Sequence, residues 1–179
     1  MKILKQANDY QYVIRPYFKH EYLDPIAKYV SWKLANNWDD YNELHHACRL
    51  VHAYDNNDNI KVDVHNILKE DEIIGLVLMA SGHIDKVETR YAIENPKKSL
   101  LLKYFHITEK GSGLGTYWLQ EELIPYYASM GFRHIYINSS HPLSFPFYLK
   151  FGNQISTYDQ QSDNNLFRRK GACFKINIG

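Results

Sequence analysis

The sequence is poor in the features that mark several classes of protein. Its 179 residues include only two cysteines, Cys48 and Cys173, which lie far apart and form no C-x-x-C pair. This spacing indicates neither a disulfide framework nor a paired-cysteine metal or redox site, and it fits a reducing compartment. No apolar run approaches the roughly 18 residues of a membrane-spanning helix, and residues 1–6 lack the apolar core of a secretory signal. We therefore expect a cytoplasmic protein that does not insert into a membrane.

An excess of charge of one sign is also lacking. Lysine and arginine number 21 against 20 aspartates and glutamates, and the only basic cluster, residues 168–170, is short. Proteins that bind nucleic acid usually carry a basic stripe or patch, so we expect no nucleic-acid partner. With 45% hydrophobic residues the chain can bury a sizeable core. We expect residues 1–179 to form a single domain.

A glycine-rich segment, residues 110–116 with the sequence Lys-Gly-Ser-Gly-Leu-Gly-Thr, is the most informative feature that is present. It lies between an apolar run at 100–107 that predicts a strand and a periodic run at 117–130 that predicts a helix. The backbone N–H groups of such a turn converge on an anion, and the helix dipole adds partial positive charge there. We predict that this turn binds a phosphorylated ligand.

The spacing of the glycines excludes one phosphate-binding motif and weakens a second. A Walker loop needs a Lys-Ser or Lys-Thr pair after its glycines, and none follows here. The dinucleotide fingerprint G-x-G-x-x-G fits Gly111 and Gly113 but meets Thr116 where its third glycine belongs. A nucleotide-binding domain is therefore the weaker alternative.

The remaining pattern, K-x-x-G-x-G between a strand and a helix, resembles the pyrophosphate loop of the GNAT superfamily of N-acetyltransferases, in which Arg or Gln usually holds the Lys110 position. Residues 144–152, Ser-Phe-Pro-Phe-Tyr-Leu-Lys-Phe-Gly, resemble the A-x-x-x-Y-x-K-x-G helix of the same family. This second segment departs from the family at three places: His141 replaces an Asn, Asn153 replaces a Phe, and Pro146 falls inside the helix.

The resemblance implies an α+β fold with a mostly antiparallel, twisted central sheet of about seven strands and about four helices, in the order β-α-α-β-β-β-α-β-α-β-β. Periodicity and turn residues place the elements along the chain. The expected strands are 12–15, 60–68, 73–80, 100–107, 132–138, 155–158 and 172–178, and the expected helices are 24–34, one beginning at Asp40, 117–130 and a short one around Tyr148.

Several helix boundaries carry their own signals. Asp24 followed by Pro25 predicts a capped helix start with proline at the first helical position. Asp40 and Glu43 resemble a capping box for the second helix. Pro125 should kink the third helix. Residues 81–99 form the longest connection without a clear period, and loops of that length are often functional.

Acetyl-CoA is the cosubstrate that the resemblance implies. The backbone of Lys103, Tyr104 and Phe105 would pair with its pantetheine arm as an added strand, and an amide near Phe105 would stabilise the thioester oxyanion. The diphosphate would be held by the amides of Lys110, Gly111, Ser112, Gly113, Leu114, Gly115 and Thr116.

The chemistry of amine acylation calls for a base and an acid. An amine is mostly ammonium at neutral pH and must lose a proton, whereas the departing thiolate benefits from gaining one. The resemblance places the acid at Tyr148. His141 is the leading candidate for the base, with His106 and Glu109 as alternatives. The nine histidines form no H-E-x-x-H motif, and we predict no metal.

The acceptor is a small-molecule or peptide amine that the sequence does not identify, and a homodimer is left open. Acidic and aromatic residues placed by the resemblance around the acceptor are Asp39, Asp40, Tyr41, Glu43, Asp159 and Asp163. We therefore predict an N-acetyltransferase that moves an acetyl group directly from acetyl-CoA to a primary amine. The altered His141 and Asn153 positions leave a catalytically silent acyl-CoA-binding or regulatory module as the alternative.

Overall fold

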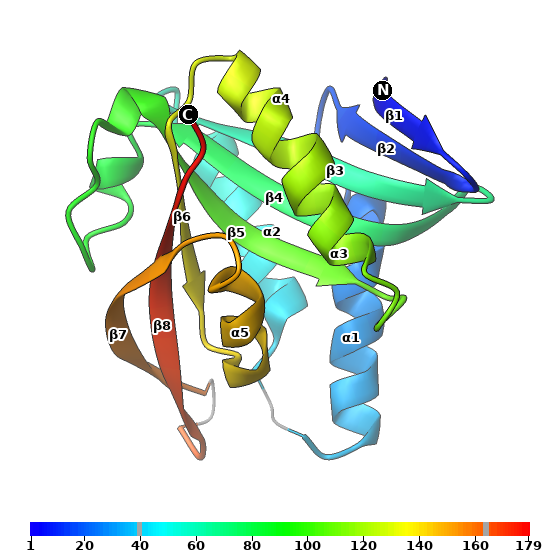
Figure 1. The fold of residues 1–179 in the computed structure, drawn as a ribbon. Coiled ribbons are helices and arrows are strands. Elements are labelled where there is room, and N and C mark those ends of the chain that lie inside the picture. Colours follow the sequence, from blue (N-terminus) through cyan, green and yellow to red (C-terminus); the bar gives the residue numbers. More distant parts are fainter. Residues whose placement is uncertain (39–40, 163–164) are drawn as a thin grey trace.

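The computed structural model describes residues 1–38, 41–162 and 165–179. Within these residues, eight strands form one sheet in the order β1-β2-β3-β4-β5-β6-β8-β7 (Figure 1). Every neighbouring pair is antiparallel except β5 and β6, which are parallel. The strands are β1 (Lys2–Ala7), β2 (Tyr10–Arg15), β3 (Ile60–Lys69), β4 (Glu72–Gly82), β5 (Ser99–Ile107), β6 (His134–Ser139), β7 (Asn153–Gln161) and β8 (Arg168–Asn177).

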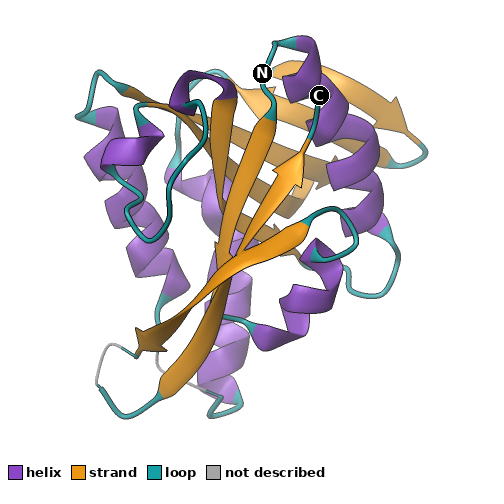
Figure 2. Ribbon diagram, turned by 60° about the vertical axis from the view of Figure 1, so that its left-hand side comes forward, coloured by secondary structure: helices purple, strands orange, loops and turns teal. Residues whose placement is uncertain are grey.

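Helices cover both faces of the sheet (Figures 1 and 2). α1 (Asp24–Ala35) and α2 (Glu43–Asp55) pack on one face, and α3 (Leu114–Tyr117), α4 (Ile124–Ser129) and α5 (Phe145–Tyr148) pack on the other. None of the helices in the described part of the chain has both the length and the apolar character needed to cross a bilayer. The predicted α+β class, with its mostly antiparallel sheet and helices in the predicted order, is confirmed.

The prediction of seven strands missed β1, so the described sheet has eight. β1 pairs antiparallel with β2 at the edge of the sheet, and most of its residues are exposed. An edge strand needs no alternating apolar pattern, because only one of its sides is paired and little of it is buried. The sequence Lys-Ile-Leu-Lys-Gln-Ala therefore carried too weak a signal.

Two helix starts differ from the prediction. The 3-10 turn His20–Leu23 leads directly into α1, so Leu23 is the N-cap and Asp24 already has helical angles (φ −48°, ψ −41°). Pro25 consequently occupies the second helical position, where its missing N–H still costs nothing. In α2 the cap is Asn42, whose side chain accepts a hydrogen bond from the His45 amide. Asp40, the predicted cap, lies outside the described residues.

The third helix begins earlier than predicted. It starts at Leu114, directly after the glycine turn, and passes through a π-helical segment, Trp118–Leu123, before α4. Pro125 cannot donate to the carbonyl four residues earlier, and a π-helical segment shifts that hydrogen-bond ladder. Pro125 lies directly after this π-helical segment, as the second residue of α4, and the ribbon in Figure 1 continues without a break. The predicted kink at Pro125 stays a prediction.

The final hairpin is longer than predicted. β7 reaches Gln161 and β8 begins at Arg168, whereas the sequence suggested a loop over 159–169. The added pairs, such as Gln160 with Arg169, join polar residues beyond the edge of the core. Hydrophobic alternation marks only the part of a hairpin that covers a core, and so the polar extension was not predicted.

A buried polar contact connects α4 with β3. The Tyr127 hydroxyl donates to Asp63 Oδ2 at 3.1 Å, and His65 Nε2 lies 2.7 Å from the same hydroxyl oxygen. His65 is fully buried, and its Nδ1 has no hydrogen-bond partner in the described structure. Burial lowers the pKa of His65 to about 4, so the folded protein keeps this ring neutral.

We expect the stability of the protein to fall as the pH drops from about 6.5 toward 4, because the unfolded chain then protonates His65 while the folded chain does not. At pH 5 this difference amounts to about 2 kcal/mol, at 1.36 kcal/mol per pKa unit. In His65→Phe, the fall between pH 7 and pH 5 should be smaller by about that amount. Urea unfolding at both pH values measures it, and parallel pH curves for the two proteins would contradict the assignment.

Candidate active site

β5 and β6 pair along only part of their length. Ser99 to Leu102 pair with His134 to Ile137, and beyond them β5 continues to Ile107, where β4 is its only strand partner among the described residues. Figure 1 shows the two strands diverging from this point. The main-chain groups of β5 that face away from β4 are therefore able to pair with an extended ligand, as in strand addition.

A β-bulge at Lys103 marks the place where pairing with β6 stops. Leu102 is opposite Met79 and Tyr104 is opposite Leu78, so Lys103 has no partner residue on β4. A bulge breaks the alternation of side chains along a strand. Accordingly, Leu102 and Phe105 contribute to the core under α3 and α4, and Tyr104 packs with the core under α1 and α2.

The predicted glycine turn directly follows β5. Gly111 and Gly113 have positive φ angles of 78° and 76°, which L-residues rarely adopt. Apart from the glycine and its two chain neighbours, no heavy atom of the described residues lies within 4 Å of a Cβ built on either glycine, so the turn is open on its outer side. Leu114 begins the helix at once, and its N-cap is Gly113. The turn thus has the backbone shape and helix position that anion binding requires.

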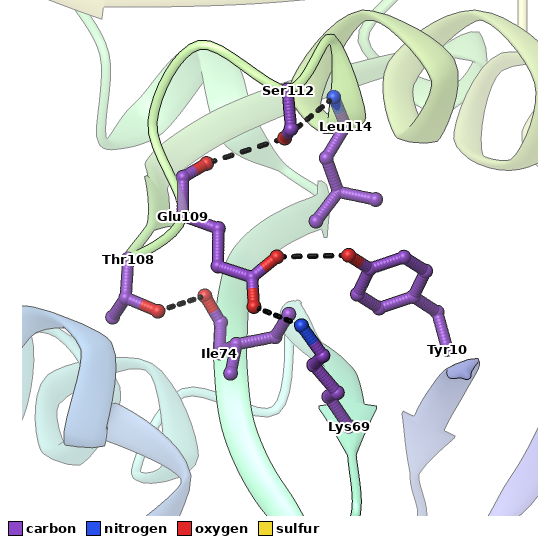
Figure 3. Close-up of polar contacts among 7 residues, drawn as sticks. All are labelled: Tyr10, Lys69, Ile74, Thr108, Glu109, Ser112 and Leu114. Atoms are coloured by element: carbon purple, nitrogen blue, oxygen red, sulfur yellow. Dashed lines mark hydrogen bonds and ion pairs between the residues drawn. The ribbon is translucent and has the colours of Figure 1, made fainter.

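A carboxylate at the start of the glycine turn, that of Glu109, anchors the turn to two neighbouring strands (Figure 3). Glu109 accepts hydrogen bonds from Tyr10 on β2 at 2.8 Å and from Lys69 on β3 at 2.7 Å. The bond from Lys69, followed by that from Tyr10, lowers the pKa of Glu109. The structure therefore places Glu109, one of the three candidates for the base, in a contact that orders the turn.

Tyr148 lies on α5, next to the unpaired part of β5. Its side chain is 6% exposed and packs against Phe147 and Phe174, with ring centroids 5.2 and 5.4 Å away. Phe147 in turn contacts the Phe105 ring at 5.4 Å. Burial raises the pKa of the Tyr148 phenol, so it holds its proton at neutral pH. The phenol is therefore in the protonated form that a proton donor needs, and its raised pKa makes it a weaker acid than a free tyrosine.

The structure brings His141 and His106 together through a tyrosine that the sequence did not single out. His141 Nε2 lies 2.9 Å from the Tyr29 hydroxyl, and the Tyr29 ring lies 5.3 Å from the His106 ring. Burial lowers the pKa of His106 to about 3, with the Lys110 charge as a smaller cause. A ring with so low a pKa is a weak base at neutral pH, which leaves His141 as the stronger candidate. Among 15 tyrosines, nothing in the sequence distinguishes Tyr29.

The residues predicted around the acceptor have different surroundings. Glu43 is buried and forms an ion pair with Lys33 at 2.6 Å, and Lys33 also donates to the Tyr41 carbonyl. Asp159 is exposed on β7, opposite Lys170. The remaining predicted acids, Asp39, Asp40 and Asp163, lie outside the described residues. Of the acidic residues that can be placed, Glu43 is thus neutralised by a lysine, and Asp159 is exposed on the surface.

A polar cluster beside the Lys103 bulge was not predicted. Glu88, with a 2% exposed side chain, accepts hydrogen bonds from the Arg90 amide and guanidinium at 3.0 Å and from the Asn138 amide group. Lys103 Nζ lies 3.9 Å from the same carboxylate, and Tyr91 donates to Asn138 at 2.9 Å. Glu88 and Arg90 belong to the long connection between β4 and β5, whose lack of periodicity was the only sequence signal.

Nowhere in residues 1–38, 41–162 and 165–179 do three His, Cys, Asp or Glu side chains gather as a metal site would require.

The sequence matches no protein-family model and no curated protein. Solved structures, in contrast, are similar over nearly the whole chain. An acetyl transferase from Salmonella typhimurium that modifies the N-terminal serine of ribosomal protein L7/L12 is 14% identical, with a TM-score of 0.64 over 99% of this chain and 100% of that one.

Two further acetyltransferase structures show the same likeness. A ribosomal-protein-alanine N-acetyltransferase from Brucella melitensis is 14% identical, with a TM-score of 0.59 over 93% of this chain and 99% of that one. A GNAT family acetyltransferase from Elizabethkingia anophelis, solved with acetyl-CoA bound, is 12% identical, with a TM-score of 0.51 over 73% and 82%. The chain therefore has the fold of the GNAT acetyltransferases, as its two motifs predicted.

We expect Gly113→Ala to lower the free energy of unfolding by about 1–2 kcal/mol, because the left-handed backbone angles that glycine adopts freely are unfavourable for alanine. Gly113→Asn is the matched variant and should cost less, since asparagine tolerates this region of φ and ψ. Urea unfolding of the three proteins measures both values. An alanine variant as stable as the wild type would show that the turn adopts another conformation.

Proposed function

We propose that this protein is an acetyl-CoA-dependent N-acetyltransferase that transfers an acetyl group directly from the bound thioester to a primary amine. The observation that supports it most is the continuity of three features: a strand that loses its partner at a bulge, an open glycine turn, and a helix that starts at the end of that turn. In a GNAT fold, these features follow one another along the whole length of the extended cosubstrate, acetyl-CoA.

Acetyl-CoA would bind along this line. The main chain of Lys103, Tyr104 and Phe105 would pair with the pantetheine arm, because the β6 side of these residues has no strand partner. The amides of 110–116 would hold the diphosphate, and the exposed Lys110 would add a positive charge. An amide near the bulge would donate to the thioester oxygen as negative charge develops on it.

The reaction needs three proton transfers. The acceptor ammonium first loses a proton, for which His141 is the candidate base, and the free amine then attacks the thioester carbon. When the tetrahedral intermediate collapses, the carbon–sulfur bond breaks and the sulfur takes a proton from the Tyr148 phenol. The nitrogen, which became positively charged on attack, gives up its extra proton, and this proton restores the Tyr148 phenol. The products are the N-acetylated amine and free coenzyme A. The position of Tyr148 on α5, beside the unpaired part of β5, supports this role.

A catalytically silent acyl-CoA-binding module is the second candidate, and the altered positions His141 and Asn153 favour it. Thermal-shift measurements with acetyl-CoA, coenzyme A, NAD and ATP test the cofactor. Stabilisation by the first two alone supports both candidates, whereas stabilisation by NAD or ATP alone supports a nucleotide-binding domain. Turnover of acetyl-CoA against a panel of amines then separates enzyme from module. Cytoplasmic location and dimerisation stay predictions.

We expect Tyr148→Phe to lower kcat by roughly 100-fold, because loss of a positioned acid typically costs a factor of 10² to 10⁴. The KM for acetyl-CoA should change little, since the ring that packs against Phe147 and Phe174 is kept. Tyr126→Phe, which removes a phenol from a partly buried helix position, is the control and should retain the wild-type rate. If Tyr148→Phe turned over as fast as wild type at every pH, Tyr148 would not be the acid, although the enzyme class would stand.

A further inference from the structure

The cluster beside the Lys103 bulge holds more basic than acidic side chains. Its ionisable members are one carboxylate, that of Glu88, and two basic groups, those of Arg90 and Lys103. The Glu88 side chain is 2% exposed and that of Lys103 is 16% exposed, so water screens both poorly. A charge removed from water is costly unless it is paired and hydrogen-bonded.

Glu88 is already committed to other partners. One of its oxygens accepts from the Arg90 amide, and the other accepts from the Arg90 guanidinium and from Asn138. Asn138 is fixed in turn by the Tyr91 hydroxyl. The carboxylate therefore orients Arg90, whose guanidinium also lies over the Tyr158 ring at 4.7 Å. Three hydrogen bonds thus occupy most of the roughly four acceptor positions of this carboxylate, and none of them comes from Lys103.

Lys103 is the member without a full partner. Its Nζ is 3.9 Å from Glu88, beyond hydrogen-bonding length, and no atom of the described residues accepts a hydrogen bond from it. Burial lowers the pKa of this lysine, with Glu88 acting in the opposite direction. The side chain retains some contact with solvent, so a ligand can reach the ammonium.

The position of Lys103 connects this cluster with the proposed reaction. Lys103 is the bulge residue of β5, at the place where the strand loses its β6 neighbour. Its main chain would border the thioester, and its side chain points to the Glu88 cluster. A group held by Lys103 Nζ would thus lie within one lysine side-chain length of the main chain that would border the thioester.

We propose that the amine acceptor carries a carboxylate close to its amine, as a free amino acid does, and that Lys103 and Arg90 hold this carboxylate. The proposal rests on the proposed acetyltransferase function and specifies its substrate class. The incoming carboxylate balances the surplus of basic groups in the cluster and supplies the acceptor that Lys103 lacks. Arg90, with its side chain 45% exposed, offers further N–H donors.

Matched pairs of acceptors test this proposal. Acetylation is measured for L-alanine and L-alaninamide, L-phenylalanine and L-phenylalaninamide, and β-alanine and its amide, with rates compared at equal concentrations of unprotonated amine. In at least one pair, we expect the acid to have a kcat/KM at least 10-fold above that of the amide. In Lys103→Met this preference should fall at least 10-fold, and in Arg90→Gln it should fall in the same direction.

Lys98→Met is the matched control, because Lys98 is an exposed lysine of the same connection and should retain the preference. Amides that equal or exceed their acids in every pair would overturn the proposal, as would a preference that survives in both cluster variants. If no amine is acetylated, the proposed enzymatic function fails. Thermal shifts of the coenzyme A complex with the same pairs of compounds then test whether the carboxylate site exists. Saturable stabilisation by acids and not by amides, lost in Lys103→Met, would support it, and equal shifts would overturn it.

Discussion

The structure depends on one interruption of backbone pairing, the end of the β5–β6 ladder at the Lys103 bulge. Up to Leu102 the two strands are ordinary parallel neighbours, and beyond it β5 keeps only β4. Main-chain donors and acceptors in a protein interior are nearly always satisfied. A strand that turns one side away from its neighbour is thus a place where a ligand can replace the missing partner. The glycine turn and the helix after it continue from the end of β5.

Two core regions hold this interruption in position. On one face, Leu102 and Phe105 pack with the helix that follows the glycine turn, and on the other face Tyr104 packs with α1 and α2. α5 adds Phe147 against Phe105. β5 therefore stays fixed by side chains after it has lost its β6 hydrogen bonds. Such rigidity favours binding, because the free strand edge needs no reordering when a ligand pairs with it.

The sequence predicted what depends on local pattern. The fold class was predicted from the apolar alternation of β3, the continuous apolar run of β4, the glycine spacing at 110–116 and the tyrosine segment around residue 148, and the structure confirms it. Elements without such a pattern were missed. β1 is a mostly exposed edge strand, and the Glu88 cluster is assembled from a connection without periodicity and from two strands. Tyr29 and His141 are in hydrogen-bonding contact although 112 positions separate them in the sequence, so no local pattern could have predicted the contact.

The contact between Glu109, Tyr10 and Lys69 has a consequence for how such a protein can vary. Tyr10 and Lys69 lie on β2 and β3, while Glu109 immediately precedes the glycine turn. The anchoring of that turn thus depends on two side chains that lie far from it in the sequence. Natural variation at positions 10 and 69 can loosen or tighten this anchoring while every glycine of the turn stays the same.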